Sequence, residues 1–256
     1  MSGHGFTTVT AIRTIIPQTA FVVPCNTITL TDFEGSGGHI AIPHQHGRPN
    51  DSGDIPRMNE STKVCVVRHG ETDWNIAGIL QGWIDVPINE KGRGQAHELS
   101  EAFAASGFTC IYTSPLSRAL ETAQIIARDL GLAPPVCHEG LKERHFGSVQ
   151  GVPKAELAEL NPVLLQQILQ RNPACSFDQG ESMDEFATRV LDALMNIGER
   201  NAGGRVLLIT HGWVMDVITR HINGLPRSAI LNMKRKNGES VWLDVLRQSI
   251  RPLHIE

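Results

Sequence analysis

The sequence predicts an α/β protein in which a mostly parallel central sheet lies between two layers of helices. Short apolar runs rich in β-branched residues, such as KVCVVR (63–68) and RVLLIT (205–210), are typical of strands buried on both faces. Segments with an apolar face at helical spacing separate these runs. Because strands that alternate with helices form parallel sheets covered on both sides, the pattern indicates a three-layer α/β sandwich.

The composition fits one globular domain and argues against several other classes of protein. The chain has 256 residues, of which 41% are hydrophobic and 20% charged, so it can bury a sizeable core. A formal net charge of -4 gives no overall basic field, and nucleic acid is therefore not an expected partner. No apolar run reaches the roughly 18 residues that span a bilayer, so we expect no membrane contact.

The five cysteines indicate a reduced, cytoplasmic protein. Their number is odd, their spacing is scattered, and no two of them form a CxxC pair. This pattern fits neither a disulfide framework nor a zinc site. We therefore expect no bound metal.

The first 57 residues differ in composition from the rest of the chain. They contain no lysine and are rich in glycine, proline, threonine and histidine, with no persistent helical period. We expect residues 1–57 to be a flexible extension and residues 58–256 to be the folded domain. Because globular character begins directly after Met58, a further hypothesis is that Met58 is the true start of the protein.

The first half of the predicted domain contains two strands and two longer helices. The strand over 63–68 precedes a helix over 90–105, in which apolar residues recur on one face. CIYTS (110–114) predicts the next strand. A helix over 116–130 ends at Gly131, because glycine readily takes the left-handed conformation that terminates helices.

The second half continues the alternation. Two short helices are expected between residues 154 and 170. Ser182 and Glu185 have the spacing of a capping box, which opens a helix running to about Glu199. The last predicted elements are a strand over 205–210, a helix over 213–221 and a strand over 240–246.

Cationic and histidine side chains follow three of the predicted strands. RHG follows one strand at 68–70, and His211 with Gly212 follows another. A third strand leads into SPLSRALETA (114–123), which places Arg118 in the first turn of a helix. The active site of such a fold lies beyond the carboxyl ends of its strands. Two arginines, two histidines and free helix N-terminal amides at one point suit a phosphoryl group.

These motifs resemble those of the histidine phosphatase superfamily, which includes the cofactor-dependent phosphoglycerate mutases. The resemblance covers about residues 63–246 and implies a phosphoglycerate mutase-like fold. The segments that carry it are VVRHGETDWN (66–75), TSPLSRALETA (113–123), LKERHFGSVQG (141–151), GES (180–182) and THG (210–212).

The resemblance implies a role for each matching residue. His69 would be the nucleophile that forms a phosphohistidine. Arg68, Arg118 and the catalytic His211 would hold the phosphoryl oxygens. Glu143 would protonate the leaving group and then activate water.

Further contacts are expected around this centre. Asn75 and Gly212 are candidate phosphate ligands, although Asn75 fits a polar residue at a helix start equally well. Gln81 and Gly82 are candidates for the substrate-binding pocket mouth. Arg144 is expected to contact remote groups of the substrate or to pair with His145.

The segment after Gln150 separates the two activities of the family. Only about thirty residues lie between Gln150 and Glu181, and Lys154 and Arg171 are the only cations among them. The mutases have a longer basic insertion there, so we favour a phosphomonoester hydrolase acting on a small phosphorylated metabolite. The basic run 234–236 is interpreted as a solvated loop, which would favour multiply anionic substrates if it faced the pocket.

Two alternatives to the hydrolase stay open. One is a cofactor-dependent phosphoglycerate mutase, and 2,3-bisphosphoglycerate would be a cofactor only in that case. The other is an inactive phospholigand-binding protein, which the presence of His69, Glu143 and His211 disfavours. The identity of the substrate and the formation of a homodimer are left open.

Overall fold

The structure is a computed structural model that describes residues 60–247 and 249–253. The chain divides into two units, Met1–Arg48 and Pro49–Glu256, and all described residues belong to the second. The predicted extension over 1–57 and the hypothesis of a start at Met58 lie outside the described residues and stay predictions.

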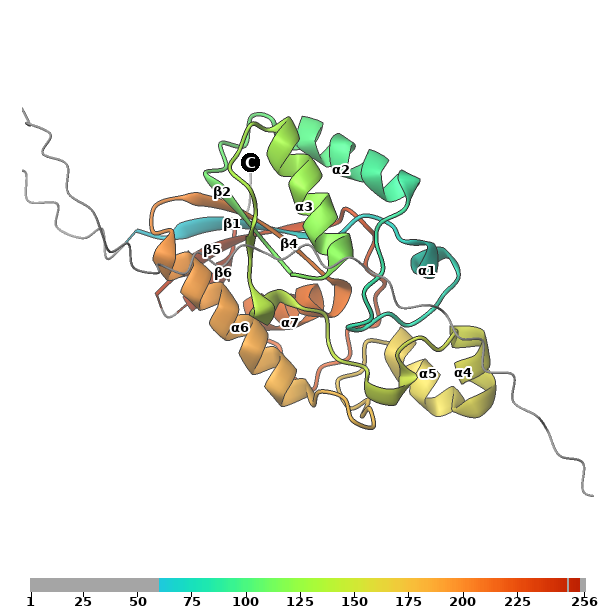
Figure 1. The fold of residues 1–256 in the computed structure, drawn as a ribbon. Helices are drawn as coiled ribbons and strands as arrows, with labels where there is room; N and C mark the ends of the chain where they lie inside the picture. The colour runs from blue at the N-terminus through green and yellow to red at the C-terminus, as the bar shows by residue number, and fades with distance from the viewer. Residues whose placement is uncertain (1–59, 248, 254–256) are drawn as a thin grey trace, which may run out of the picture. The chain divides into compact units, whose positions relative to one another are not determined.

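Six strands form one sheet in the order β3-β2-β4-β1-β5-β6 (Figure 1). The parallel strands are β1 (Thr62–Arg68), β2 (Cys110–Thr113), β3 (Val136–Cys137) and β4 (Arg205–Thr210). The antiparallel strands at one side are β5 (Ser240–Leu246) and β6 (Ser249–Pro252).

The register of the two central strands positions the site. Arg68, the last residue of β1, lies opposite Thr210, the last residue of β4. The residue that follows each strand is a histidine. His69 and His211 therefore leave the sheet side by side at its carboxyl edge.

Helices cover both faces of the sheet, as Figure 1 shows. These helices are α2 (Glu90–Phe103), α3 (Ser117–Asp129), α6 (Met183–Arg200) and α7 (Gly212–Ile222). Cys65 and Val67 of β1 pack in a cluster with α2 and α3, whereas Val64 and Val66 pack in a cluster with α6 and α7. Successive side chains of a strand point to opposite faces, so one apolar strand supplies both cores. The predicted three-layer α/β sandwich is confirmed.

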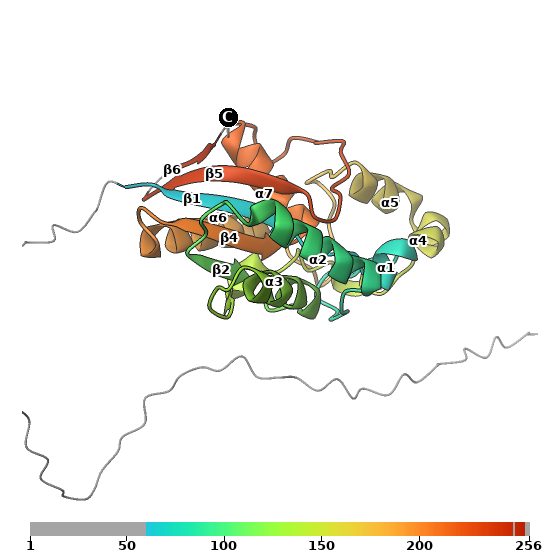
Figure 2. The ribbon, with the colours of Figure 1, turned by 90° about the horizontal axis from the view of Figure 1, so that it is seen from above.

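Three short helices lie beyond the carboxyl ends of the parallel strands (Figure 2). They are α1 (Asp73–Ile76), α4 (Lys154–Leu160) and α5 (Pro162–Leu169). Thr72 and Asn75 cap the N-terminus of α1 with reciprocal hydrogen bonds between the side chain of each and the backbone of the other. Asn161 caps α5, which begins with Pro162. Two 3-10 turns, η1 (Glu139–Leu141) and η2 (Gly147–Val149), flank the segment that carries Glu143.

The predicted boundaries differ from the structure by one or two residues at several helix ends. The capping box of Ser182 and Glu185 opens α6 as expected. The elements that sequence patterns missed are α1, β3 and β6, each of four residues or fewer. Such short elements depend on neighbours distant in the sequence, as β6 depends on its pairing with β5. Within the described ranges, no helix has both the length and the apolarity needed to cross a bilayer.

Candidate active site

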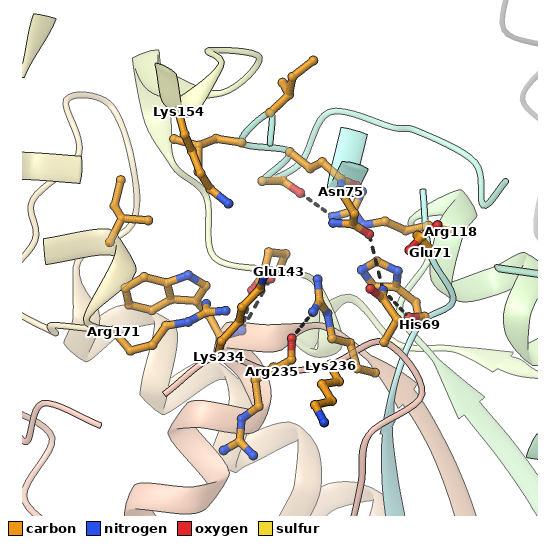
Figure 3. A pocket seen from close by; sticks show the side chains of 18 of the residues that line it. His69, Glu71, Asn75, Arg118, Glu143, Lys154, Arg171, Lys234, Arg235 and Lys236 are labelled. Carbon is orange, nitrogen blue, oxygen red and sulfur yellow. Dashed lines mark hydrogen bonds between the residues drawn. The ribbon is translucent and has the colours of Figure 1, made fainter. Parts of the chain in front are cut away.

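A cavity of about 690 Å³ opens at the carboxyl edge of the sheet (Figure 3). Seven of the ten predicted site residues line it: Arg68, His69, Asn75, Gln81, Gly82, Arg118 and Glu143. They come from the ends of β1 and η1, from α1 and α3, and from the loop that follows α1. Their convergence agrees with the placement of active sites in α/β folds.

His69 is held as a neutral imidazole with one nitrogen available to a ligand. Its side chain is only 3% exposed. Nδ1 lies 2.7 Å from the carbonyl oxygen of Gly70, which can only accept a hydrogen bond. The proton therefore sits on Nδ1, and Nε2 keeps its lone pair. Burial, together with the charges of Arg118 and Arg68, holds the pKa of His69 well below its ordinary value.

His211 lies beside His69 but does not line the cavity itself. The two ring centroids are 5.1 Å apart. His211 is fully buried, and its Nε2 lies 2.8 Å from Oγ of Ser114. Its Nδ1 has no hydrogen-bond partner among the described residues. Burial and the charge of Arg118 hold the pKa of His211 well below its ordinary value.

Arg68 and Arg118 bring buried positive charge to the cavity. Arg118 donates from Nη2 to the carbonyl oxygen of Gly82 at 2.7 Å, and Arg68 donates from Nη1 to that of Arg235 at 2.5 Å. The Nε atoms of both are buried without a described partner. Burial lowers the pKa of each to about 10, so both are cationic at neutral pH. No described carboxylate forms an ion pair with either one. Unpaired buried charge is unfavourable, and an anionic ligand would relieve it.

Glu143 faces the same cavity from a buried position. Its Oε1 accepts hydrogen bonds from the backbone amides of Arg144 at 3.0 Å and Trp213 at 3.2 Å. Burial raises the pKa of the carboxyl group, although the Arg144 amide and nearby cations act in the opposite direction. A carboxyl with a raised pKa is suited to donate a proton near neutral pH.

Asn75 and Gln81 border the cavity and also join in local structure. Oδ1 of Asn75 accepts from the amide of Thr72 and lies 3.3 Å from Nδ2 of Asn237. Asn75 thus lines the cavity and also takes part in the N-terminal cap of α1, and its contact with phosphate stays a prediction. Nε2 of Gln81 donates to Oγ1 of Thr72, while its Oε1 is buried without a partner in the described part of the chain.

Arg144 lies outside the cavity, against the expectation that it contacts substrate. Its guanidinium group donates to the carbonyl oxygens of Cys175 at 2.9 Å and Glu181 at 3.0 Å. It also stacks over the rings of Phe177 and Trp213. Through these contacts the Arg144 side chain connects the segment after η1 with the segment that contains Cys175 and Glu181. The alternative pairing with His145 is not seen either.

Gly212 is likewise absent from the cavity lining. It begins α7 directly after His211. A Cβ added to it would lie 3.3 Å from Nη2 of Arg171, so the lack of a side chain leaves room for that guanidinium group. The predicted contact between Gly212 and phosphate therefore has no support from the geometry and stays a prediction.

Several cationic residues that the sequence did not assign to the site also line the cavity. They are Lys154, Arg171, Lys234, Arg235 and Lys236. The interpretation of 234–236 as a solvated loop is wrong for Arg235, which is buried and ion-paired with Asp216 at 2.9 Å. A sequence signal existed: Asp216 is a lone acid in the otherwise apolar stretch GWVMDVI, and such a residue needs a buried cation.

The fold and this site define an enzyme of the phosphoryl-transfer class. A family model described as "Histidine phosphatase superfamily (branch 1)" matches residues 64–255. The chain belongs to this superfamily, as its motifs indicated.

Named relatives in the family include phosphatases and mutase-like proteins. "Metal-independent phosphoserine phosphatase" of Arabidopsis thaliana is 38% identical over 169 residues, covering 65% of this chain and 71% of the relative. "Phosphoglycerate mutase-like protein 4" of the same plant is 35% identical over 167 residues, covering 64% and 71%. Among solved structures, YhfR of Bacillus stearothermophilus gives a TM-score of 0.69 at 30% identity, covering 75% of this chain and 95% of that one.

Proposed function

We propose that this chain is a phosphomonoester hydrolase that acts through a phosphohistidine at His69 and requires no metal ion. The observation that carries the proposal is a neutral imidazole next to two buried guanidinium groups without a carboxylate partner, with a carboxyl group whose pKa is raised by burial in the same cavity. Its substrate would be a small phosphorylated metabolite, and we place the reaction in the cytoplasm.

In the first step, Nε2 of His69 attacks the phosphorus atom. The new P–N bond forms as the P–O bond to the leaving group breaks. Arg68 and Arg118 hold the remaining oxygens and stabilise the charge of the transition state. Glu143 gives its proton to the departing alkoxide, so the product leaves as an alcohol.

In the second step, water replaces the histidine. Glu143, now a carboxylate, takes a proton from the water molecule as its oxygen attacks phosphorus. The P–N bond breaks, phosphate leaves, and His69 returns to its neutral form. Because guanidinium groups supply the positive charge, neither step calls on a metal; the name of the Arabidopsis phosphoserine phosphatase supports this part of the proposal.

The mutase alternative is retained because of one structural observation. The segment between Gln150 and Glu181 is short and has few cations, which favours a hydrolase. Lys234 nevertheless adds positive charge at the cavity from another part of the chain. A mutase that uses 2,3-bisphosphoglycerate would need such charge.

The test is phosphate release from a panel of phosphomonoesters in excess EDTA, with His69→Ala as the blank. We expect the wild type to release phosphate and to form an acid-labile phosphoenzyme that the variant lacks. 3-Phosphoglycerate is also assayed for isomerisation with 2,3-bisphosphoglycerate present. Isomerisation without release would make the chain a mutase. Binding without either activity would make it a phospholigand-binding protein.

A further inference from the structure

The cavity carries more positive charge than a single phosphoryl group requires. Seven of its lining residues are lysine or arginine, whereas two are glutamate. Arg68 and Arg118 face the proposed phosphoryl site. Arg235 is neutralised by Asp216 and Glu239.

The remaining cations that reach toward the open side are Lys154, Arg171 and Lys234, whereas Figure 3 shows Lys236 extending away from the cavity.

Arg171 is fixed in place by several contacts. It follows α5 with a φ of 55°, and its carbonyl oxygen accepts a hydrogen bond from Nη2 of Arg220 at 2.6 Å. Its Nε lies 3.5 Å from Oδ2 of Asp216, and its guanidinium group lies over the ring of Trp213. The side chain is 15% exposed. No described acceptor takes a hydrogen bond from its Nη atoms, which leaves these donors for a ligand.

Asp216 links this arginine to the rest of the site. Its fully buried carboxylate is shared by Arg171 and Arg235, so one negative charge faces two positive ones. The carbonyl oxygen of Arg235 in turn accepts from Arg68. Because Glu239 also pairs with Arg235, two carboxylates offset Arg171 and Arg235, and Arg68 leaves this linked group with one net positive charge.

Lys154 and Lys234 face the same region from two other segments. Figure 3 shows Lys154 reaching into the cavity from α4. Burial and the charges of Arg171, Lys234 and Arg68 lower the pKa of Lys154, and all four residues line the same cavity. No carboxylate of the described residues pairs with Lys154 or Lys234. Like charges held together without a partner favour the binding of an anion.

We propose that Arg171, Lys154 and Lys234 form a second anion subsite, so that the substrate is a phosphomonoester bearing another anionic group, a carboxylate or a second phosphate. The proposal rests on the proposed function for the position of the reacting phosphoryl group. Arg171 is its central residue, because it alone is both fixed by the fold and supplied with free bidentate donors.

Matched substrates test the subsite. 3-Phosphoglycerate and glycerol 3-phosphate differ in having a carboxylate or a hydroxymethyl group at the same position. We expect wild-type kcat/KM to favour 3-phosphoglycerate by about tenfold or more, as one charge-assisted contact allows. Arg171→Gln and Lys234→Gln should each reduce this preference by raising KM for 3-phosphoglycerate, with glycerol 3-phosphate unaffected.

Two additions sharpen the experiment. Arg128→Gln, at an exposed position on α3, is the matched control and should keep the wild-type preference. Propane-1,3-diol bisphosphate compared with 3-hydroxypropyl phosphate separates a preference for phosphate from one for carboxylate. Lys234 is exposed, so its variant keeps the test valid if Arg171→Gln fails to fold.

The outcomes separate this inference from the proposed function. Equal kcat/KM for both members of both pairs, or equal losses for both in Arg171→Gln, would overturn the subsite while hydrolysis stands. If no ester is hydrolysed, the proposed function fails. Calorimetric binding of the same esters to the wild type and to Arg171→Gln then decides the subsite. Tighter binding of the doubly anionic ester, lost in the variant, supports it, and equal binding overturns it.

Discussion

Glu143 lies in surroundings that favour a protonated carboxyl group. Burial raises its pKa, and two backbone amides fix one of its oxygens. Its place in the cavity with His69 gives it access to a leaving group. Its contribution should therefore depend on how much the leaving group needs a proton.

Replacement of Glu143 by glutamine tests this dependence. Glutamine keeps an oxygen for the amides of Arg144 and Trp213 but has no acidic proton. We expect kcat for alkyl phosphates to fall by about 10²–10⁴-fold. Formation of the phosphoenzyme from 4-nitrophenyl phosphate, measured as a burst of nitrophenolate, should fall much less because that leaving group needs no proton.

Glu139→Gln is the control for this substitution. Glu139 is an exposed carboxylate in the same region of the chain and pairs with Lys142. Its variant should retain activity on both classes of ester. Equal losses for alkyl and aryl esters in Glu143→Gln would count against a role as proton donor.

The residues of the reacting centre could be predicted because short motifs carry them. His69, Arg68 and Arg118 follow strands or open a helix within a few residues of a recognisable pattern, and the structure brings them together. Arg171 and Asp216 could not be found in this way. Their contact joins segments 45 residues apart in sequence, and no local pattern specifies it. The motif around Glu143 also led to the expectation that Arg144 contacts substrate. Its guanidinium group instead donates to backbone carbonyl oxygens, and no local pattern in the sequence indicates those contacts.

At the scale of elements, the end of β1 and the start of α2 meet at two glycines. A Cβ added to Gly70 would lie 2.5 Å from the carbonyl oxygen of Gly92 and 3.0 Å from its Cα. Both are backbone atoms and cannot rotate away. The glycine after His69 thus allows α2 to approach the strand end that carries the reacting imidazole.

Gly70→Ala should therefore both destabilise the protein and impair the site. We expect a loss of about 1–3 kcal/mol in the free energy of unfolding, measured by urea titration, together with reduced kcat. Gly94→Ala is the matched control on α2, since a Cβ there meets nothing within 4 Å. It should stabilise the helix by about 0.5–1 kcal/mol. Similar stabilities for both variants would contradict the close approach.

The longer elements were predictable and the short ones were not. β1 and β4 are continuous apolar runs, and α6 begins at a recognisable capping box. The two-residue β3 is defined only by its pairing with β2. A strand or helix could therefore be predicted from its own sequence only where its pattern was too long to arise by chance.

At the scale of the whole molecule, folding buries two histidines in neutral form. His69 and His211 both have pKa values well below the ordinary value of 6.5. In the unfolded chain they bind protons below that pH, whereas in the folded protein they do not. The unfolded state then holds more protons, so acidification favours unfolding.

We accordingly expect the free energy of unfolding to fall as the pH is lowered from about 8 to about 5.5. Glu143 acts in the opposite direction, because its raised pKa lets the folded state keep a proton. A variant with both histidines replaced by asparagine should show a shallower decrease in urea titrations across this range. The same slope in both proteins would contradict the assignment of neutral, buried imidazoles.

The central sheet and the periphery contribute different parts of the cavity. His69 and His211 extend from β1 and β4, the two innermost strands, whose apolar residues are completely buried. Lys154 is the first residue of α4, Arg171 follows α5, and Lys234 precedes β5. None of these three residues belongs to the two buried clusters that contain the apolar side chains of β1 and β4. Substrate preference in this architecture can therefore diverge between descendants of one ancestor while the chemical step is inherited unchanged.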